Sequence, residues 1–529
     1  MSGSVAPDRG SALIRAGAIL SATYFASRVL GYARTLVLGT TFGAGPELSA
    51  FYAAFRLPDL IYQIVAAGAM GSALIPVLSG LLAKGERAHA WNVVATLANL
   101  LLLALAILAG IAFVAAPTIV GYLTPGYHGD ILIQTVELTR IMLAAPILLA
   151  LGAVATSALN AEGRFTAAAL APIVYNLMII AGAVVLGPRI GVTGVAIGVV
   201  VGAAGHLAIQ LPSIFRLGFR PILRIDLEDS AARRVLGLLG PRALGLGATQ
   251  VTFIVMTALA SSLGDAAVAT YSIAFALLQI PLGVIGIPLG IVIFPSISRE
   301  HALGAIGTYV SLVTRAVRLL IFVMVPLAAL GMALRVPMVE LLFGYGRFDR
   351  DAIEGTAGIL AAFLFGLPAH ASIAVLARAF YARQDTRTPV VAAILAVVIN
   401  TTLGVAFVGP LGLPGLAAAI AIASWIEAGF LLVALGRHVP SFAPAGILVV
   451  LAESVAGAVV AGAVAVAVAA VLGDLLVAGA AKPAILLGLS IAAGLGGGAY
   501  LAVSLVLRIP ELPTIFGLVA DQIRRRRRS

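Results

Sequence analysis

The sequence predicts an all-α polytopic membrane protein with about fourteen transmembrane helices. Of its 529 residues, 61% are hydrophobic and only 10% are charged, and the mean hydropathy is +1.11. A soluble domain carries about 25% charged residues and could not bury this much apolar surface. Glycine is abundant, with 58 residues, and small residues suit helices that pack closely within a membrane.

Fourteen apolar stretches are long enough to cross a hydrocarbon core, which takes about 20 helical residues. The predicted spans are 14–40, 48–80, 89–117, 132–159, 165–187, 191–215, 237–262, 266–298, 309–334, 351–382, 388–408, 412–436, 445–472 and 482–508. Within the eighth span, the cluster "IPLGVIGIPLG" at 280–290 predicts a bend, because proline removes a backbone hydrogen bond.

Basic residues concentrate in alternate loops, which is typical of loops that stay in the cytoplasm. With the N-terminus inside, the outside loops hold only Arg189, Arg335, Arg347, Arg350 and Lys482. This pattern predicts a multi-pass membrane protein with both termini cytoplasmic. The first span is too long and too interrupted by arginine for a cleaved signal peptide, and we expect it to be retained as an anchor.

Five arginines form the terminal run Arg524–Arg528. Such a run favours an anchor at an anionic leaflet over a nucleic-acid-binding arm. The sequence contains no cysteine, and its six histidines are scattered. We therefore expect no metal site and no cofactor.

Three pairs of segments match at nearly constant offsets, which indicates an internal duplication of six helices plus six. The pairs are 71–80 with 290–299, 158–166 with 379–388, and 191–196 with 412–417. Because six spans separate the copies, the repeats are parallel. The predicted organisation is an N-terminal lobe (1–220), an interfacial linker helix (221–236), a C-terminal lobe (237–440), helices 13 and 14 (441–510) and a basic cytoplasmic tail (511–529). Two facing lobes predict a central cavity.

Two arginines interrupt the first span, Arg28 and Arg34 within "ASRVLGYARTLVLG". An arginine at the centre of a bilayer costs about 2.5–3.5 kcal/mol on insertion scales. Arg56 adds a third cation in the second span. Charged residues at such positions are candidates for function, although Arg34 has the alternative of snorkelling to the interface and Arg56 that of pairing with Asp59.

Several motifs carry a family resemblance: "SRVLGYAR" at 27–34, "FGAGPELSAFYAAFRLPDLI" at 42–61, "AMGSALIPVLS" at 69–79, "LTPGYHGD" at 123–130 and "FYARQDTRTPV" at 380–390. In these the chain resembles the lipid II flippases of bacterial cell-wall synthesis, within the multidrug/oligosaccharidyl-lipid/polysaccharide exporter superfamily. The resemblance implies fourteen helices in two lobes, a cationic central cavity, a lateral gate, and a groove for the polyprenyl tail on the last two helices.

The resemblance also implies a role for the three arginines. Lipid II carries a pyrophosphate, and the guanidinium fork suits phosphate oxygens, so Arg28, Arg34 and Arg56 are predicted to bind the headgroup. The chain departs from the family pattern where a charged residue is common, at Ser49, Gln63, Ala67 and Ala276.

Three further polar residues in the predicted C-terminal lobe are candidates for a secondary cavity or ion-coupling site: Arg378, Asn400 and Glu427. Two roles are open for Glu427: an ion pair with Arg378, or binding of a coupling cation. Asn400 lies where some family members bind sodium. The predicted driving force is the membrane potential, sodium or protons.

The predicted function is a lipid II flippase working by alternating access, as a monomer among membrane lipids, with no catalysis on covalent bonds. The alternatives are a flippase for another polyprenyl-linked glycan of the O-antigen, capsule or teichoic type, and a drug or cation antiporter of the same superfamily. A membrane glycosyltransferase is a third alternative, but it would need larger outside loops with paired carboxylates. A fourth is a non-transporting scaffold, which would have lost the family's charged residues together with the transport activity.

Overall fold

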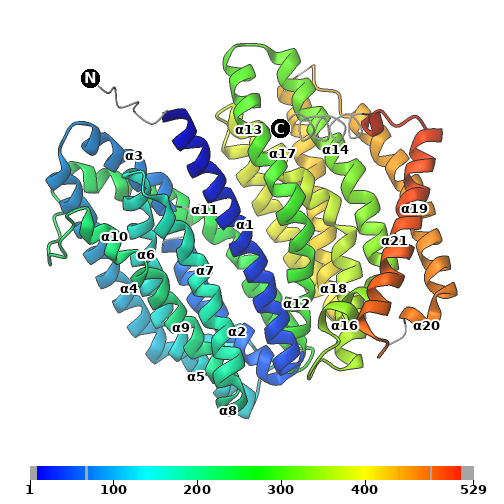
Figure 1. Cartoon of the computed structure of the whole chain (residues 1–529), viewed down its shortest axis with the longest axis horizontal. Helices are drawn as coiled ribbons and strands as arrows, with labels where there is room; N and C mark the ends of the chain where they lie inside the picture. The colour runs from blue at the N-terminus through cyan, green and yellow to red at the C-terminus, as the bar shows by residue number, and fades with distance from the viewer. Residues whose placement is uncertain (1–8, 66–68, 440, 477–478, 514–529) are drawn as a thin grey trace, which may run out of the picture. The chain divides into compact units, whose positions relative to one another are not determined.

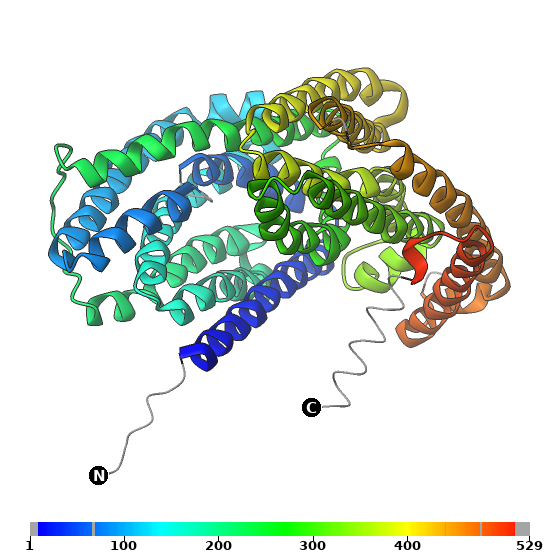
Figure 2. The ribbon, with the colours of Figure 1, turned by 90° about the horizontal axis from the view of Figure 1, so that it is seen from above.

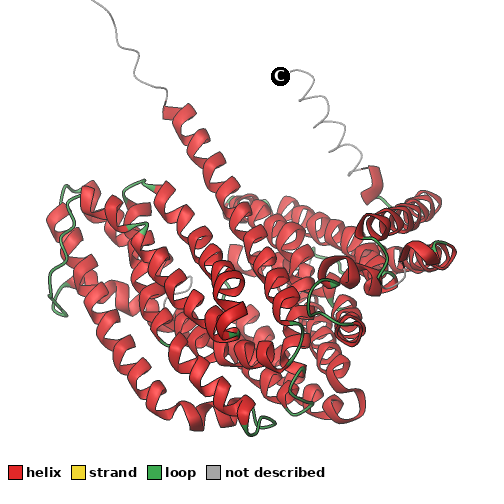
Figure 3. Ribbon diagram, turned by 60° about the horizontal axis from the view of Figure 1, so that its bottom comes forward, coloured by secondary structure: helices red, strands yellow, loops and turns green. Residues whose placement is uncertain are grey.

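The computed structural model describes residues 9–65, 69–439, 441–476 and 479–513, and every regular element in these ranges is a helix (Figure 3). Nine of the described helices are long and apolar enough to cross a membrane. The bent pair of Arg350–Phe365 (α16) and Leu367–Ala382 (α17) makes a tenth if it is one span. The all-α membrane class is confirmed, and the count of fourteen spans stays a prediction.

Packing between helices divides the chain into two compact units, Met1–Ala269 and Thr270–Ser529 (Figure 1). The helices of the first unit are α1 (Arg9–Phe42), α2 (Pro46–Val65), α3 (Ala69–Ala83), α4 (Arg87–Leu123), α5 (Asp130–Met142), α6 (Ala144–Ala161), α7 (Phe165–Ala181), the π-helical turn η1 (Gly182–Leu186), α8 (Gly187–Ile190), α9 (Val192–Ala208), α10 (Leu211–Arg216) and α11 (Ser230–Ser261).

The second unit is built from the remaining helices. They are α12 (Ala267–Pro281), which begins at the boundary, the π-helical turn η2 (Leu282–Gly286), α13 (Ile287–Ala302), α14 (Ile306–Ala333), α15 (Arg335–Phe343), α16, α17, α18 (Arg387–His438), α19 (Ala445–Val471), α20 (Gly473–Leu476) and α21 (Lys482–Val506). The turn η2 lies within 280–290, where the sequence predicts a bend, and it follows directly on Pro281.

The outer face of α4 shows why the composition is so apolar. Leu103, Ile107, Ile111 and Val114 are 51–77% exposed and lie three or four residues apart, so they form one continuous stripe on the helix. An apolar stripe of this length is unfavourable in water and suits contact with lipid. The opposite face of α4 packs into a core with α3, α6 and α11, in which Leu74, for example, is fully buried.

The predicted linker helix at 221–236 is wrong. The chain is non-helical from Gly218 to Asp229, and α11 then runs unbroken from Ser230 to Ser261. Asp226 explains the coil, because its Oδ1 accepts the N–H groups of Glu228 and Asp229 and closes a turn. Asp229 then caps α11 by accepting two N–H groups of its first turn.

Helix α11 packs against α2, α3 and α4 and therefore clusters with the first unit. The sequence places the equivalent span, 237–262, at the start of the C-terminal lobe. The compact units thus divide about one helix later in the chain than the predicted lobes do. The lobe boundaries themselves stay a prediction.

Backbone geometry supports the internal duplication. Gly191 and Gly412, which are 221 residues apart, have nearly the same unusual conformation, with φ +62° and ψ −149° against φ +59° and ψ −143°. The other positive-φ positions that recur at an offset of 217 to 221 residues are Gly43 with Gly264, Gly85 with Gly304, Gly129 with Gly346, and Gly163 with Gln384. Because a positive φ is costly for most residues, five such pairs in register indicate two copies of one helical pattern. At Gly412 the geometry also breaks α18 into two helical segments.

The C-terminal helices pack closely through small residues. A Cβ at Gly457 of α19 would lie 3.0 Å from the ring of Tyr500 in α21, and one at Gly496 would lie 2.8 Å from the carbonyl oxygen of Ala461. The Tyr500 hydroxyl donates to the carbonyl of Phe322 in α14 at 2.8 Å. These contacts join α19 and α21, seen as neighbouring orange and red helices in Figure 2, to α14.

Candidate functional site in the first unit

The first two predicted site residues, Arg28 and Arg34, lie on α1, which packs along α7. Both arginines are half-buried. Their separation of six residues corresponds to about 9 Å along the helix axis. Arg34 lies within electrostatic range of Tyr52 and Asp59 of α2, and of Tyr175 of α7. The structure therefore brings α1, α2 and α7 together around the Arg34 guanidinium.

Arg56, the third predicted residue, is held by a cradle on α11. Its Nε donates to the Thr257 hydroxyl oxygen at 3.1 Å, and its guanidinium carbon lies 5.2 Å from the centre of the Phe253 ring. The Thr257 hydroxyl donates its own proton to the Phe253 carbonyl at 2.7 Å. Because that proton is used, the oxygen faces Arg56 as an acceptor. One helical turn of α11 thus supplies both an acceptor and an aromatic face to one guanidinium.

Asp59 joins the arginines into one charged cluster. It lies within charge-interaction range of both Arg56 and Arg34, and Gln63 donates to its Oδ1 at 3.5 Å. Arg34, Arg56 and Asp59 together carry a formal charge of one positive, and Arg28, on the same helix as Arg34, adds a second positive charge. A pyrophosphate carries about two negative charges at neutral pH, so the charges match in sign and size.

A cavity of about 280 Å³ lies beside Arg56, between α2, α4 and α11. The rest of its wall is apolar or aromatic, formed by residues such as Leu60, Tyr122 and Ile254. A cation at the edge of an apolar wall suits a phosphate that is attached to a hydrocarbon chain.

Two of the departures from the family pattern have structural roles in the first unit. Ser49 is fully buried, and its Oγ accepts the backbone N–H of Ala269 at 2.9 Å, so the hydroxyl serves the start of α12. Gln63 bonds Asp59 as described. Ala276 is half-buried on α12, and Ala67 lies outside the described residues.

The candidates of the second unit do not form a cluster of paired charges. Arg378 donates Nη1 to the carbonyl of Ala374 on its own helix, and among the described residues it makes no ion pair with Glu427. Tyr381 lies within charge-interaction range of both residues. Asn400 is buried at 3% exposure, and neither atom of its amide has a hydrogen-bond partner in the described chain.

The cradle residues Thr257 and Phe253 are functional candidates that sequence reasoning missed. They lie about two hundred residues from Arg56, and a lone threonine or phenylalanine in an apolar span carries no signal. Tyr175 was missed for the same reason.

Comparisons with known proteins identify the family. A family model described as lipid II flippase MurJ matches residues 38–483. The chain belongs to this family. The matched range includes Arg56, whereas Arg28 and Arg34 precede it.

Relatives in the MurJ family are similar over most of their length. The lipid II flippase MurJ of Burkholderia cenocepacia is 30% identical over 436 residues, which cover 80% of this chain and 84% of the relative. The probable lipid II flippase MurJ of Rhizobium meliloti is 30% identical over 476 residues, covering 84% and 86%.

Solved structures confirm the fold. A lipid II flippase MurJ in an inward closed conformation superposes with a TM-score of 0.77 at 22% identity, covering 92% of this chain and 98% of that one. An inward-facing multidrug resistance MATE family transporter of the MOP superfamily gives 0.68 at 16% identity, covering 78% and 95%. The fold is therefore the one that the family resemblance of the sequence predicts.

Proposed function

We propose that this protein is a lipid II flippase, which moves the lipid-linked peptidoglycan precursor from the inner to the outer leaflet of a bacterial cytoplasmic membrane. Family membership supports the substrate class, since relatives at 30% identity are named lipid II flippases. The observation that carries the proposal to residues is the cluster of Arg34, Arg56 and Asp59 in the first unit, with Arg28 on the same helix as Arg34.

In this proposal the arginines bind the pyrophosphate of lipid II, and the apolar residues around them exclude water. Each guanidinium offers a planar set of N–H donors to phosphate oxygens and stays charged at all relevant pH. Thr257 orients Arg56 before substrate arrives, so less side-chain entropy is lost on binding. The tail stays in lipid throughout, and only the polar headgroup needs a sheltered path across the membrane. No covalent bond is made or broken, and the protein acts as a transporter by alternating access.

The membrane potential supplies the driving force in this proposal. Moving one net negative charge outward across 100 mV, inside negative, gains about 2.3 kcal/mol. Coupling to sodium or protons through Asn400 or Glu427 is the competing mechanism. The proposal also includes cytoplasmic termini and a monomeric transporter.

A second candidate substrate is another polyprenyl-linked glycan. The observation that favours it is Ser49, whose side chain is committed to the Ala269 N–H in place of the acidic group that is common in the family. A different charge pattern suits a different headgroup on the same pyrophosphate.

A complementation assay separates the two substrates. A host is depleted of its own flippase and expresses this chain, and the fraction of lipid II that an externally added cleaving enzyme reaches is measured. We expect the chain to restore most of the lost exposure. If a well-expressed chain restores none, lipid II is not its substrate, and the same assay with other polyprenyl-linked glycans becomes the test of the second candidate.

A further inference from the structure

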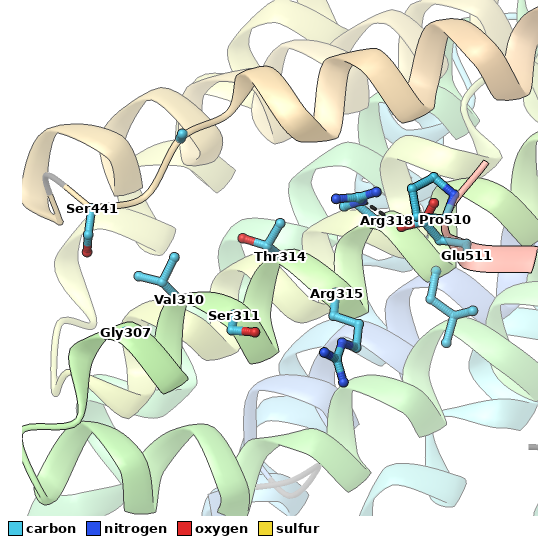
Figure 4. A pocket seen from close by; sticks show the side chains of 11 residues that line it. Gly307, Val310, Ser311, Thr314, Arg315, Arg318, Ser441, Pro510 and Glu511 are labelled. Carbon is cyan, nitrogen blue, oxygen red and sulfur yellow. Dashed lines mark ion pairs between the residues drawn. The ribbon is translucent and has the colours of Figure 1, made fainter. Parts of the chain in front are cut away.

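The second unit contains a cavity that the proposed transport site does not use. It has a volume of about 590 Å³ and lies between α14, the segment before α19 and the residues that follow α21 (Figure 4). Its polar wall consists of Ser311, Thr314, Arg315, Arg318, Ser441 and Glu511. We propose that this cavity is a binding site for the headgroup of an anionic glycerophospholipid of the phosphatidylglycerol type, separate from the transported lipid.

One end of the cavity is a buried ion pair. Arg318 Nε lies 2.6 Å from Glu511 Oε1, and the Glu511 side chain is only 7% exposed. The first turn of α19 passes beside the pair, since a Cβ at Gly446 would lie 3.9 Å from Arg318 Nη1. The pair therefore holds the segment after α21 against α14.

The second carboxylate oxygen of Glu511 lacks a donor. Oε2 is buried and has no hydrogen-bond partner among the described residues. A buried charged oxygen without a donor is energetically unfavourable. Because Glu511 lines the cavity, a ligand that carries a hydroxyl donor completes its hydrogen bonding.

Arg315 supplies the matching positive charge. It lies three residues before Arg318 on α14, is exposed to the cavity, and makes no hydrogen bond or ion pair within the described ranges. Two arginines and one carboxylate leave a net charge of one positive. The hydroxyls of Ser311 and Thr314 lie on the same stretch of α14 and add donors (Figure 4). The lining therefore selects a group with one negative charge and a hydroxyl.

A phosphatidylglycerol headgroup has these properties. Its phosphodiester carries one negative charge for Arg315, and its glycerol hydroxyls are donors for Glu511 Oε2. Apolar residues such as Val310, Leu319 and Pro510 complete the wall, as expected for a molecule that continues into hydrocarbon. The start of α14 is predicted to lie on the cytoplasmic side, where the leaflet is anionic. These features favour a membrane lipid over free phosphate.

Calorimetric titration of the purified full-length protein in a neutral detergent tests the site. The probes are dihexanoyl phosphatidylglycerol, dihexanoyl phosphatidylmethanol (the same charge without headgroup hydroxyls), dihexanoyl phosphatidylcholine and inorganic phosphate. We expect phosphatidylglycerol to bind at least tenfold more tightly than phosphatidylcholine and inorganic phosphate, and several-fold more tightly than phosphatidylmethanol.

Variants assign the binding to this cavity. Arg315→Ala should weaken phosphatidylglycerol binding about tenfold, the loss expected for one charged hydrogen bond, and Arg315→Lys should weaken it less. Arg299→Ala removes an exposed arginine of α13 outside the cavity and should leave binding unchanged. Equal binding of phosphatidylcholine, equally tight binding of inorganic phosphate, or equal losses in the Arg315 and Arg299 variants would each overturn the proposal. The titration needs no flipping activity, so its outcome is independent of the proposed function.

Discussion

The cradle of Arg56 makes a specific prediction for Thr257→Val. Valine has nearly the volume of threonine but lacks the hydroxyl that accepts from Arg56 Nε at 3.1 Å. A hydrogen bond to a charged group contributes about 1.5–3 kcal/mol. Because the Phe253 ring still faces the guanidinium, we expect the lower end of that range.

A loss of about 1.5 kcal/mol corresponds to about tenfold in the fraction of Arg56 that is correctly oriented. We therefore expect Thr257→Val to lower the rate of lipid II flipping about tenfold in proteoliposomes that are loaded with fluorescent lipid II and probed by an external cleaving enzyme. Thr257→Ser keeps an acceptor and should stay within about twofold of the wild type.

Thr402→Val is the matched control. The Thr402 hydroxyl donates to the Val398 carbonyl of its own helix at 2.9 Å, and the residue belongs to α18 of the second unit, whereas the arginine cluster belongs to the first. It should flip lipid II at the wild-type rate. The reasoning is refuted if Thr257→Val flips normally while Arg56→Ala is inactive, or if Thr257→Ser is as slow as Thr257→Val.

Three further predictions concern stability and ion coupling. Lys482→Met leaves the buried Glu340 carboxylate without the Nζ that lies 2.7 Å away. The free energy of unfolding in mixed micelles should therefore fall by about 3 kcal/mol. Adding Glu340→Gln should recover part of that loss, whereas additive losses in the double variant would argue against the pair. Burial alone would raise the pKa of Asp229, but hydrogen bonds from the Ala232 N–H and His89 outweigh it and lower that pKa. The stabilisation by the cap is therefore present above about pH 4 and lost as the pH falls further. Asp229→Ala should lower the free energy of unfolding by about 1 kcal/mol at pH 7, and this difference from the wild type should shrink in acid. A difference that does not change with pH would contradict the prediction. Asn400→Leu removes a buried amide without partners and should leave both stability and flipping intact if the potential drives transport; loss of sodium-dependent flipping in this variant would identify Asn400 with a coupling site.

The sequence was sufficient for the features that depend on local pattern. Apolar stretches of helical length predict where helices lie, and the offset of 221 residues between "GVTGVA" and "GLPGLA" recurs as matching backbone geometry at Gly191 and Gly412. The arginines within the first two spans are visible because charge is rare in such segments.

Features that depend on packing between distant segments were not predictable. The partner of Arg56 is set by how α2 meets α11, and nothing near Thr257 in the sequence marks it. The interfacial helix at 221–236 was wrong because Asp226 and Asp229 bond nearby N–H groups and delay the start of the helix to Ser230. The sequence places Lys482 among the charges of an outside loop, whereas in the structure its Nζ donates to Glu340 Oε1 at 2.7 Å.

The most direct test of the central claim is the flipping rate of Arg28→Ala in proteoliposomes that contain lipid II, beside the wild type and Arg299→Ala at equal protein density. Arg28 is one of the two arginines of the first span that are predicted to bind the pyrophosphate, whereas Arg299 is exposed near the end of α13. The account predicts that the wild type and Arg299→Ala move lipid II at similar rates and that Arg28→Ala is slower by at least tenfold. A folded Arg28→Ala that flips lipid II at the wild-type rate would contradict it.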